Sequence, residues 1–338
     1  MKQHPESEYN NQVYYRLIAL WVICEGFAGG IMHAAKLPFT GLIVSSLAVT
    51  CIILIAYYVP GRSAILKATI IVAIFKLMLS PHSPPTAYIA VLFQGFLGQL
   101  LFSNKRYFNI GCIMLAVLAL VESAIQRILV LVIVYGNDLW KAINLFLQKL
   151  TNEKDPTNYS FIIAFFYILL HALIGVWVGI HAARMAKRSS GWKNMYPDLT
   201  FDKMNPITEI ETQKNSNNKK IKLVFILIWL ALIVFYIQSY LDPKHALIPS
   251  GVVINIILRS VLILLSWTLI LSPLLMLLIK SLLRSQKIQN KQEINEVMLL
   301  LPQTRYIFKQ SFKLSENKKG FSRIKSFFKI LLINILAD

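Results

Sequence analysis

Long apolar runs alternate with short polar gaps along most of this chain. A helix needs about 20 apolar residues to cross the hydrocarbon of a bilayer. Eight runs reach or approach that length: residues 13–35, 39–59, 64–80, 87–102, 108–135, 160–185, 223–241 and 251–283. The pattern predicts an all-α polytopic membrane protein. We expect a six-helix bundle (residues 1–190), a cytoplasmic linker rich in Lys, Asn, Ser and Thr (191–222), and a second module (223–338) with about two further membrane-spanning helices.

Composition supports the same class. The chain has 338 residues, of which 56% are hydrophobic and 15% charged, and its mean hydropathy is +0.57. A soluble core of this size cannot hide so much apolar side chain. The first run follows a polar stretch rather than a basic one and precedes no small-residue cleavage site, so we expect a retained helix. The cysteines lack metal or disulfide spacing and are expected to be core residues: Cys24, Cys51 and Cys112.

Lys and Arg collect in every second gap between the first six apolar runs. Within these gaps or at the run ends beside them lie Lys2 and Arg16, Arg62 and Lys67, Lys105 and Arg106, and Arg184, Lys187, Arg188 and Lys193. The alternate gaps contain few basic residues or balance them with acids. Because Lys and Arg are enriched in cytoplasmic loops, we expect cytoplasmic termini and a multi-pass protein of the cell inner (plasma) membrane. The net charge of +19 flanks apolar runs, so nucleic acid is not an expected partner.

The C-terminal tail is basic and has apolar residues at helical spacing. Ile294, Val297 and Met298 begin a stripe that Pro302 interrupts, and the stripe resumes over residues 306–312. Another amphipathic segment follows at 321–336. We therefore expect separate amphipathic helices on either side of Pro302. Two interpretations remain open: basic helices that lie on anionic lipid, or a docking platform for cytoplasmic proteins.

The tail resembles the cytoplasmic coupling region of the T component of energy-coupling factor (ECF) transporters. An apolar helix ends in a proline-containing turn (298–302), a basic helix follows (305–314), and a glycine, Gly320, precedes a further basic helix with an apolar end. That family's Ala-Arg-Gly signature is absent from this chain, and Lys318, Lys319 and Gly320 stand near its expected place. The first six helices resemble the substrate-binding S component. The resemblance implies cytoplasmic ABC-type ATPases as partners, with a further T-type membrane subunit as an option, and these partner-binding residues: Arg305, Lys309, Lys313 and Lys319.

Small residues in the first run form one face. Gly26, Gly30 and Ala34 are spaced by four residues, which permits the close approach of another helix backbone. S components contact the T component through a small-residue face on their first helix, so the resemblance implies a partner-binding role for these three residues. Ordinary packing within the chain is the alternative.

Polar residues inside the apolar runs are the candidates for ligand binding, because burying them costs several kcal/mol unless they are paired or face a cavity. Glu122 and Gln126 share a helix face and Arg127 lies one position around, so a ligand can meet an acceptor and a forked donor together. Structural pairs of Glu122 with Arg127 or His171 are the alternative. Glu25, which is nearer the cytoplasm, is expected to pair with a neighbouring helix. The candidate substrate-binding set is Arg127, Glu122, Gln126, His171, Gln94, Lys76 and His33.

Enzymatic motifs are absent from the sequence. It contains no GxSxG, HExxH, Walker A or GxGxxG pattern, so we expect no cofactor, no metal site and no catalysis by this chain. The leading hypothesis is a membrane subunit of an ATP-driven ECF-type importer, which captures a small vitamin-like or metal solute in the six-helix module. The alternatives are a membrane-embedded lipid-handling protein or enzyme, and a membrane scaffold for a cytoplasmic complex.

Overall fold

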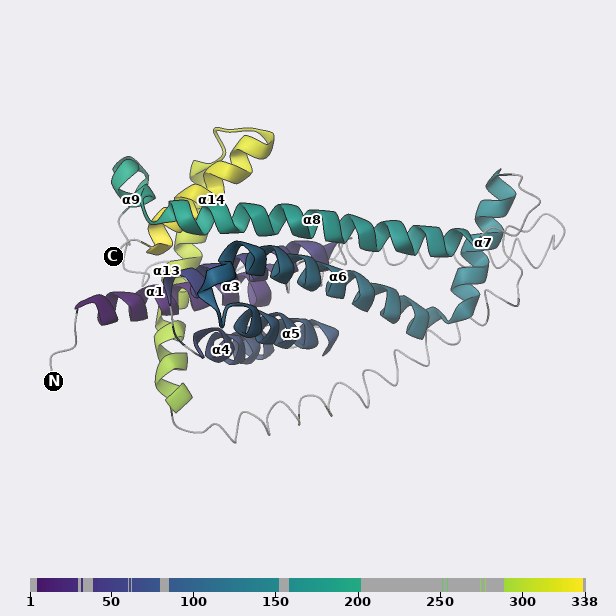
Figure 1. Cartoon of the computed structure of the whole chain (residues 1–338), viewed down its shortest axis with the longest axis horizontal. Coiled ribbons are helices and arrows are strands. Elements are labelled where there is room, and N and C mark those ends of the chain that lie inside the picture. Colours follow the sequence, from purple (N-terminus) through teal and green to yellow (C-terminus); the bar gives the residue numbers. More distant parts are fainter. Residues whose placement is uncertain are drawn as a thin grey trace, which may run out of the picture. The chain divides into compact units, whose positions relative to one another are not determined.

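The computed structural model describes residues 5–29, 32, 39–59, 61, 63–79, 85–151, 158–201, 251, 254, 274, 277 and 289–336. Within these residues every regular element is a helix (Figure 1), which confirms the all-α class for this part of the chain. The elements are α1 (Pro5–Val22), η1 (Ile23–Ala28), α3 (Thr40–Tyr58), α4 (Ala64–Leu79), α5 (Pro85–Leu101), η2 (Lys105–Tyr107), α6 (Phe108–Tyr135), α7 (Asn137–Thr151), α8 (Tyr159–Ser189), α9 (Trp192–Met195), η3 (Pro197–Leu199), α13 (Gln289–Leu314) and α14 (Gly320–Leu336).

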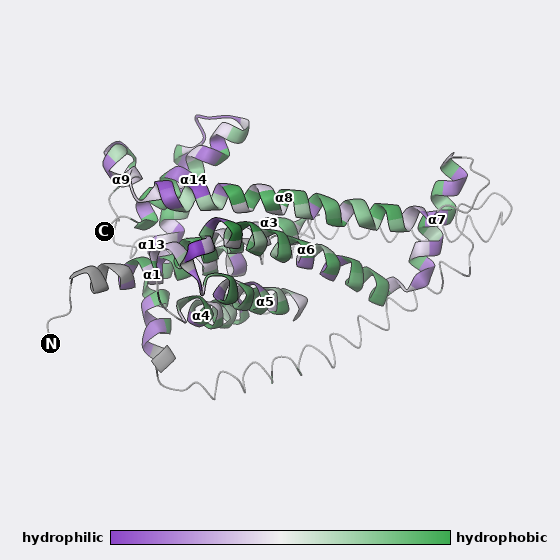
Figure 2. Ribbon diagram, viewed as in Figure 1, coloured by the Kyte–Doolittle hydropathy of each residue, from purple (hydrophilic) through white to green (hydrophobic). Residues whose placement is uncertain are grey.

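Three described helices are long and apolar enough to cross a membrane: α3, α6 and α8. They coincide with the predicted runs at 39–59, 108–135 and 160–185. In α6 and α8 only 17% of the apolar window is buried, against 56% in α3. Figure 2 shows hydrophobic residues along most of α6 and α8. Their apolar surface is therefore available to lipid, as expected of a membrane protein.

The remaining predicted spans have different outcomes. The runs at 64–80 and 87–102 form α4 and α5, which are shorter helices of 16 and 17 residues. The run at 13–35 is not one regular helix, because α1 begins at Pro5 and changes into the π-helical turn η1 at Ile23. The runs at 223–241 and 251–283 lie outside the described residues, apart from four isolated positions.

Residue contacts divide the chain into two compact units. Unit 1 contains Met1–Ser123, His171–Ile210 and Leu282–Asp338, and unit 2 contains Ala124–Leu170 and Glu211–Ser281. The division differs from the expected boundary near residue 190, because the tail belongs to the same unit as the N-terminal helices. α6 and α8 each contribute residues to both units.

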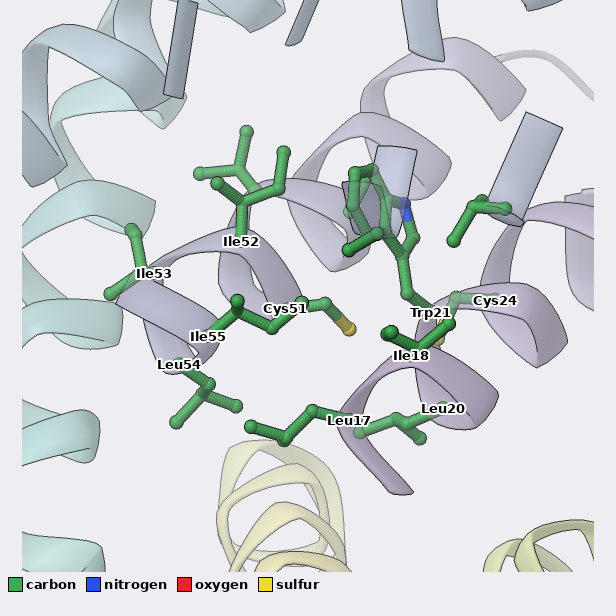
Figure 3. Packing of buried hydrophobic residues seen from close by; sticks show 14 of the residues in the cluster. Leu17, Ile18, Leu20, Trp21, Cys24, Cys51, Ile52, Ile53, Leu54 and Ile55 are labelled. Atoms are coloured by element: carbon green, nitrogen blue, oxygen red, sulfur yellow. The ribbon is translucent and has the colours of Figure 1, made fainter. Parts of the chain in front are cut away.

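The core of unit 1 is built on α1 and α3. Figure 3 shows side chains from these two helices, among them Leu17 and Trp21 of α1 and Cys51 and Ile55 of α3. All four side chains are at most 2% exposed. The same cluster contains Val297 and Ile307 of α13 and several α14 residues: Leu331, Leu332, Ile335 and Leu336. The amphipathic tail helices thus bury one face in protein.

Pro302 does not separate two helices, contrary to the sequence-based expectation. α13 runs without a break from Gln289 to Leu314, with Pro302 inside it. A proline in a helix removes one backbone hydrogen bond and crowds the preceding turn. Pro302 lies on the exposed side, while Val297 and Ile307 on either side of it are 0% and 2% exposed. The burial of these two residues holds both halves of the helix against the core.

Glycines on α8 allow a close contact with α6 inside unit 1. A Cβ atom added at Gly175 would lie 2.7 Å from Cα of Val117, and one at Gly179 would lie 2.6 Å from Cα of Ile113. The two glycines form a G-x-x-x-G pattern, which is typical of close helix contacts in membranes. The spacing of Gly175 and Gly179 is visible in the sequence, although it was not among the small-residue patterns interpreted above.

Candidate functional site

A buried ion pair lies in the interior of unit 1. Nζ of Lys76 in α4 is 2.6 Å from Oε2 of Glu25 in η1, and both side chains are 2% exposed. Lys76 also donates to the carbonyl of Ala87 at 3.2 Å. Its Nζ lies 5.9 Å from the ring centroid of Tyr88, within the range of a cation–π contact. The ammonium group thus has partners from η1 and α5, and the expectation that Glu25 pairs with a neighbouring helix is confirmed.

Glu25 stands in a π-helical turn. The backbone N–H of Gly29 donates to the carbonyl of Cys24, which is the i to i−5 bond of a π-helix. π-Helical turns are rare and occur frequently at functional sites. Gly26 belongs to the same turn, and a Cβ atom there would lie 3.2 Å from Cδ1 of Leu79 in α4. The small residue at position 26 therefore lets η1 approach α4 within the chain. Gly30 and Ala34 lie outside the described residues.

Burying this ion pair is energetically demanding. Moving two charges out of water costs several kcal/mol per ion, and their attraction offsets the cost only with good geometry and additional hydrogen bonds. Ionisable residues inside apolar helices are rare and are commonly functional. Because apolar residues of similar volume would stabilise the core at least as well, the pair is the strongest functional candidate in unit 1.

Gln94 forms a second buried polar contact. Its Nε2 donates to Oγ of Ser45 in α3 at 3.0 Å, and the residue is 1% exposed. Its Oε1 atom has no hydrogen-bond partner among the described residues. Gln94 lies two turns along α5 from Ala87, on the same buried side of that helix. α5 therefore presents polar atoms to the protein interior at two levels.

The other predicted ligand-binding residues occupy different environments. Glu122 is half-buried and His171 is 1% exposed, and both belong to unit 1. Gln126 and Arg127 belong to unit 2, where Gln126 is half-buried and Arg127 is exposed. His33 lies outside the described residues.

A small cavity of about 20 Å³ lies within unit 1, apart from the ion pair. A cavity of this size has room for one water molecule, whereas pockets for small-molecule ligands measure about 300–1,000 Å³. It contains none of the predicted ligand-binding residues. Its lining comes from α1, η1, α3, α8, α13 and α14: Leu20, Cys24, Leu47, Thr50, Cys51, Leu54, Met185, Phe308, Phe328, Leu331 and Leu332.

The predicted partner-binding cations lie on the outside of unit 1. Arg305, Lys309 and Lys313 of α13 are exposed and spaced by four residues, so they share one face. Lys319, which precedes α14, is also exposed. Apolar side chains more than half exposed lie beside them in the sequence: Phe312, Leu314, Phe321 and Ile324. We call these eight residues the basic surface.

Contacts between α13 and α14 stabilise the basic surface. The Arg323 guanidinium lies 4.7 Å from the ring centroid of Phe312 and 3.7 Å from the carboxylate of Glu316. Phe327 of α14 packs edge-on against Phe308 of α13, with ring centroids 5.1 Å apart. These contacts hold the start of α14 against the end of α13.

Comparisons with protein-family models, with curated proteins and with solved structures give no match to this chain. The resemblance to ECF transporter subunits therefore stays a prediction. Two features bear most directly on function. They are the buried pair of Glu25 and Lys76 and the basic surface on α13 and α14.

Proposed function

We propose that this protein is the membrane subunit of an ATP-driven importer of the ECF type, with six helices in its first module, two further spans and cytoplasmic termini. In this proposal α13 transmits the movement of cytoplasmic ABC-type ATPases to α1, and through α1 to the buried ion pair. One observation carries it: the helix that presents the basic surface packs directly on the helix that leads into Glu25.

The contact between α13 and α1 provides a mechanical connection. Val297 and Ile307 of α13 share the buried cluster with Val13 and Leu17 of α1. α4 joins the same assembly at its first turns, because the hydroxyl of Tyr14 donates to the carbonyl of Ala64 at 2.8 Å. The ammonium of Lys67 also lies 3.7 Å from a carboxylate oxygen of Glu293 in α13. α13 thus contacts both helices that lead to the ion pair.

The charge of the basic surface favours an acidic partner. Arg305, Lys309 and Lys313 carry three positive charges along one face, and no acidic residue lies between residues 297 and 315. Charge complementarity chiefly sets association rate and specificity, while the neighbouring exposed Phe and Leu side chains supply apolar contact area. A groove on an ATPase with acidic and apolar residues fits both features.

The ion pair supports transport of a small polar solute. While closed, Glu25 and Lys76 satisfy each other, and the separate cavity of about 20 Å³ in unit 1 is too small for such a molecule. If η1 and α4 move apart, each charged group loses its partner in an apolar environment. A zwitterionic vitamin-like solute can replace both partners at once, because its anionic group can meet Lys76 and its cationic group can meet Glu25. Gln94, with an acceptor atom that lacks a described partner, would add a hydrogen-bond site.

Affinity purification of the tagged full chain from its native membranes tests the proposal. We expect two ABC-type ATPase subunits to copurify. The triple variant Arg305→Glu, Lys309→Glu, Lys313→Glu should lose them, whereas Lys187→Glu with Arg188→Glu, exposed basic residues of α8, should retain them. A wild-type preparation that contains no ATPase but holds a bound lipid would overturn the proposal and support lipid handling. Copurification of a cytoplasmic complex that contains no ATPase would also overturn it and would support the alternative of a membrane scaffold.

A further inference from the structure

α7 crosses the ends of two long apolar helices in unit 2. Gly136, with a φ of 68°, ends α6 and turns the chain, and its N–H donates to the carbonyl of Val132 at 2.8 Å. Oδ1 of Asn144 then accepts from the N–H of Ser160, at the start of α8, at 2.8 Å. Figure 1 shows α7 running across the direction of α6 and α8. α7 lies in what was predicted to be a polar gap between the runs at 108–135 and 160–185.

The residues of α7 divide into an apolar and a polar face. Leu139, Ile143, Phe146 and Leu150 follow one another at helical spacing and form the apolar face. Phe146 is 42% exposed and Leu150 is 69% exposed. The opposite face carries Asn137, Lys141, Asn144 and Gln148. The second half of the apolar face, at Phe146 and Leu150, is therefore largely exposed.

The lengths of α6 and α8 indicate what the apolar face of α7 contacts. α6 and α8 have 28 and 31 residues, or about 42 and 46 Å at 1.5 Å per residue. The hydrocarbon core of a bilayer is about 30 Å thick, so helices of this length reach the membrane surface. A helix that crosses their ends lies parallel to that surface. Aromatic residues of the kind enriched at membrane interfaces lie at this level: Tyr135, Trp140 and Tyr159.

We infer that α7 is an interfacial anchor, whose apolar face sits at the boundary between lipid headgroups and acyl chains. The apolar face continues the outward apolar surface of the adjoining helices, where Ile133 is 56% and Phe161 is 79% exposed. This continuity assigns lipid, rather than another protein, to Phe146 and Leu150. Lys141 and Lys149, both exposed, would reach the headgroups and the water, as in other interfacial helices.

Site-directed fluorescence in proteoliposomes tests the anchor. Phe146→Cys and Leu150→Cys place a thiol on the apolar face, and Lys141→Cys and Gln148→Cys place one on the polar face as matched controls. The native cysteines are buried and are expected to stay unlabelled; a labelling blank of the parent protein verifies this. Each variant of the full chain is labelled with an NBD maleimide in vesicles of phosphatidylcholine and phosphatidylglycerol.

Two quenchers distinguish lipid from water and from protein. At positions 146 and 150 we expect blue-shifted NBD emission, strong quenching by lipids with a doxyl group near the headgroup, and weak quenching by aqueous iodide. At 141 and 148 the iodide should quench strongly. Equal iodide quenching at all four positions would overturn the inference. Blue-shifted emission at 146 and 150 that doxyl lipids do not quench would also overturn it, because the face would then contact protein, such as a second copy.

Discussion

Lys76 of α4 and Glu25 of η1 form an ion pair of 2.6 Å in which each side chain is 2% exposed. The pair links η1, which continues α1, to α4. Because α1 packs on α13 and α4 packs on α5, the pair is the most informative target for mutation.

Removing one partner of the pair should destabilise the protein strongly. Lys76→Met leaves the Glu25 carboxylate buried without its cation, and breaking a buried pair in this way costs about 3–5 kcal/mol. Unfolding titrations in detergent micelles measure the change. Lys319→Met is the control, because Lys319 is exposed and surface substitutions usually change the unfolding free energy by at most about 0.5 kcal/mol.

Replacing both partners should restore most of the stability. In the double variant Glu25→Leu, Lys76→Met no buried charge remains, and apolar replacements of buried pairs are often neutral or stabilising. If the pair serves solute transport, this variant folds and copurifies with its partners but does not transport. A double variant as unstable as Lys76→Met would show that the two residues do not act as a pair.

The contact between α8 and α6 should not tolerate a methyl group. In Gly179→Ala the added Cβ would lie 2.6 Å from Cα of Ile113 and 2.8 Å from the carbonyl oxygen of Cys112, and backbone cannot yield as a side chain does. Overpacking of this kind costs about 1–3 kcal/mol, measurable by thermal denaturation in detergent. Gly191→Ala is the control, because its nearest neighbour, Cε of Met195, would be 3.5 Å away. Equal effects would argue against the close contact.

The attachment of α13 to α1 should depend on one buried side chain. Ile307→Ala removes a residue that is 2% exposed, and such truncations cost about 2–5 kcal/mol. Leu299→Ala on the same helix removes one that is 73% exposed and should change the unfolding free energy by at most about 0.5 kcal/mol. Unfolding titrations compare the two. A larger effect of Leu299→Ala would mean that a partner or lipid covers the other face of α13.

Asn334 should hold α14 to the segment that follows α8. Its Oδ1 accepts from the N–H of Phe201 at 3.1 Å, and its Nδ2 donates to the carbonyl of Leu199 at 2.9 Å. Asn334→Ala leaves both backbone groups without these partners, at a cost of about 1–3 kcal/mol. Hydrogen exchange should show faster exchange of the Phe201 amide. Asn317→Ala, at an exposed position between α13 and α14, should leave that amide unchanged.

Local sequence patterns were sufficient to predict several of the helices. The runs at 39–59, 108–135 and 160–185 coincide with α3, α6 and α8 because apolar length is a local property that packing does not alter. α7 was missed although Leu139, Ile143 and Phe146 stand at helical spacing. α7 has only 15 residues and a polar face, so a criterion of about 20 apolar residues for a membrane span does not detect it.

Other features depend on contacts between distant residues. Pro302 by itself predicts a helix break, but α13 continues through it because Val297 and Ile307 are buried on either side. Arg127 and Lys76 are both cations in apolar runs, yet the first is exposed and the second is 2% exposed. Nothing in the flanking residues distinguishes them, because the difference lies in which helix becomes the neighbour.

The sequence by itself determined that this protein is helical, that it has helices apolar enough to cross a membrane, and that a basic tail follows them. These properties follow from apolar length and from helical periodicity, which are local. Only the tertiary structure decided that Glu25 and Lys76 are partners, that η1 is a π-helical turn and that the tail helices bury one face against α1. These relationships require helices far apart in the sequence to pack together, and many packings are compatible with the same local pattern.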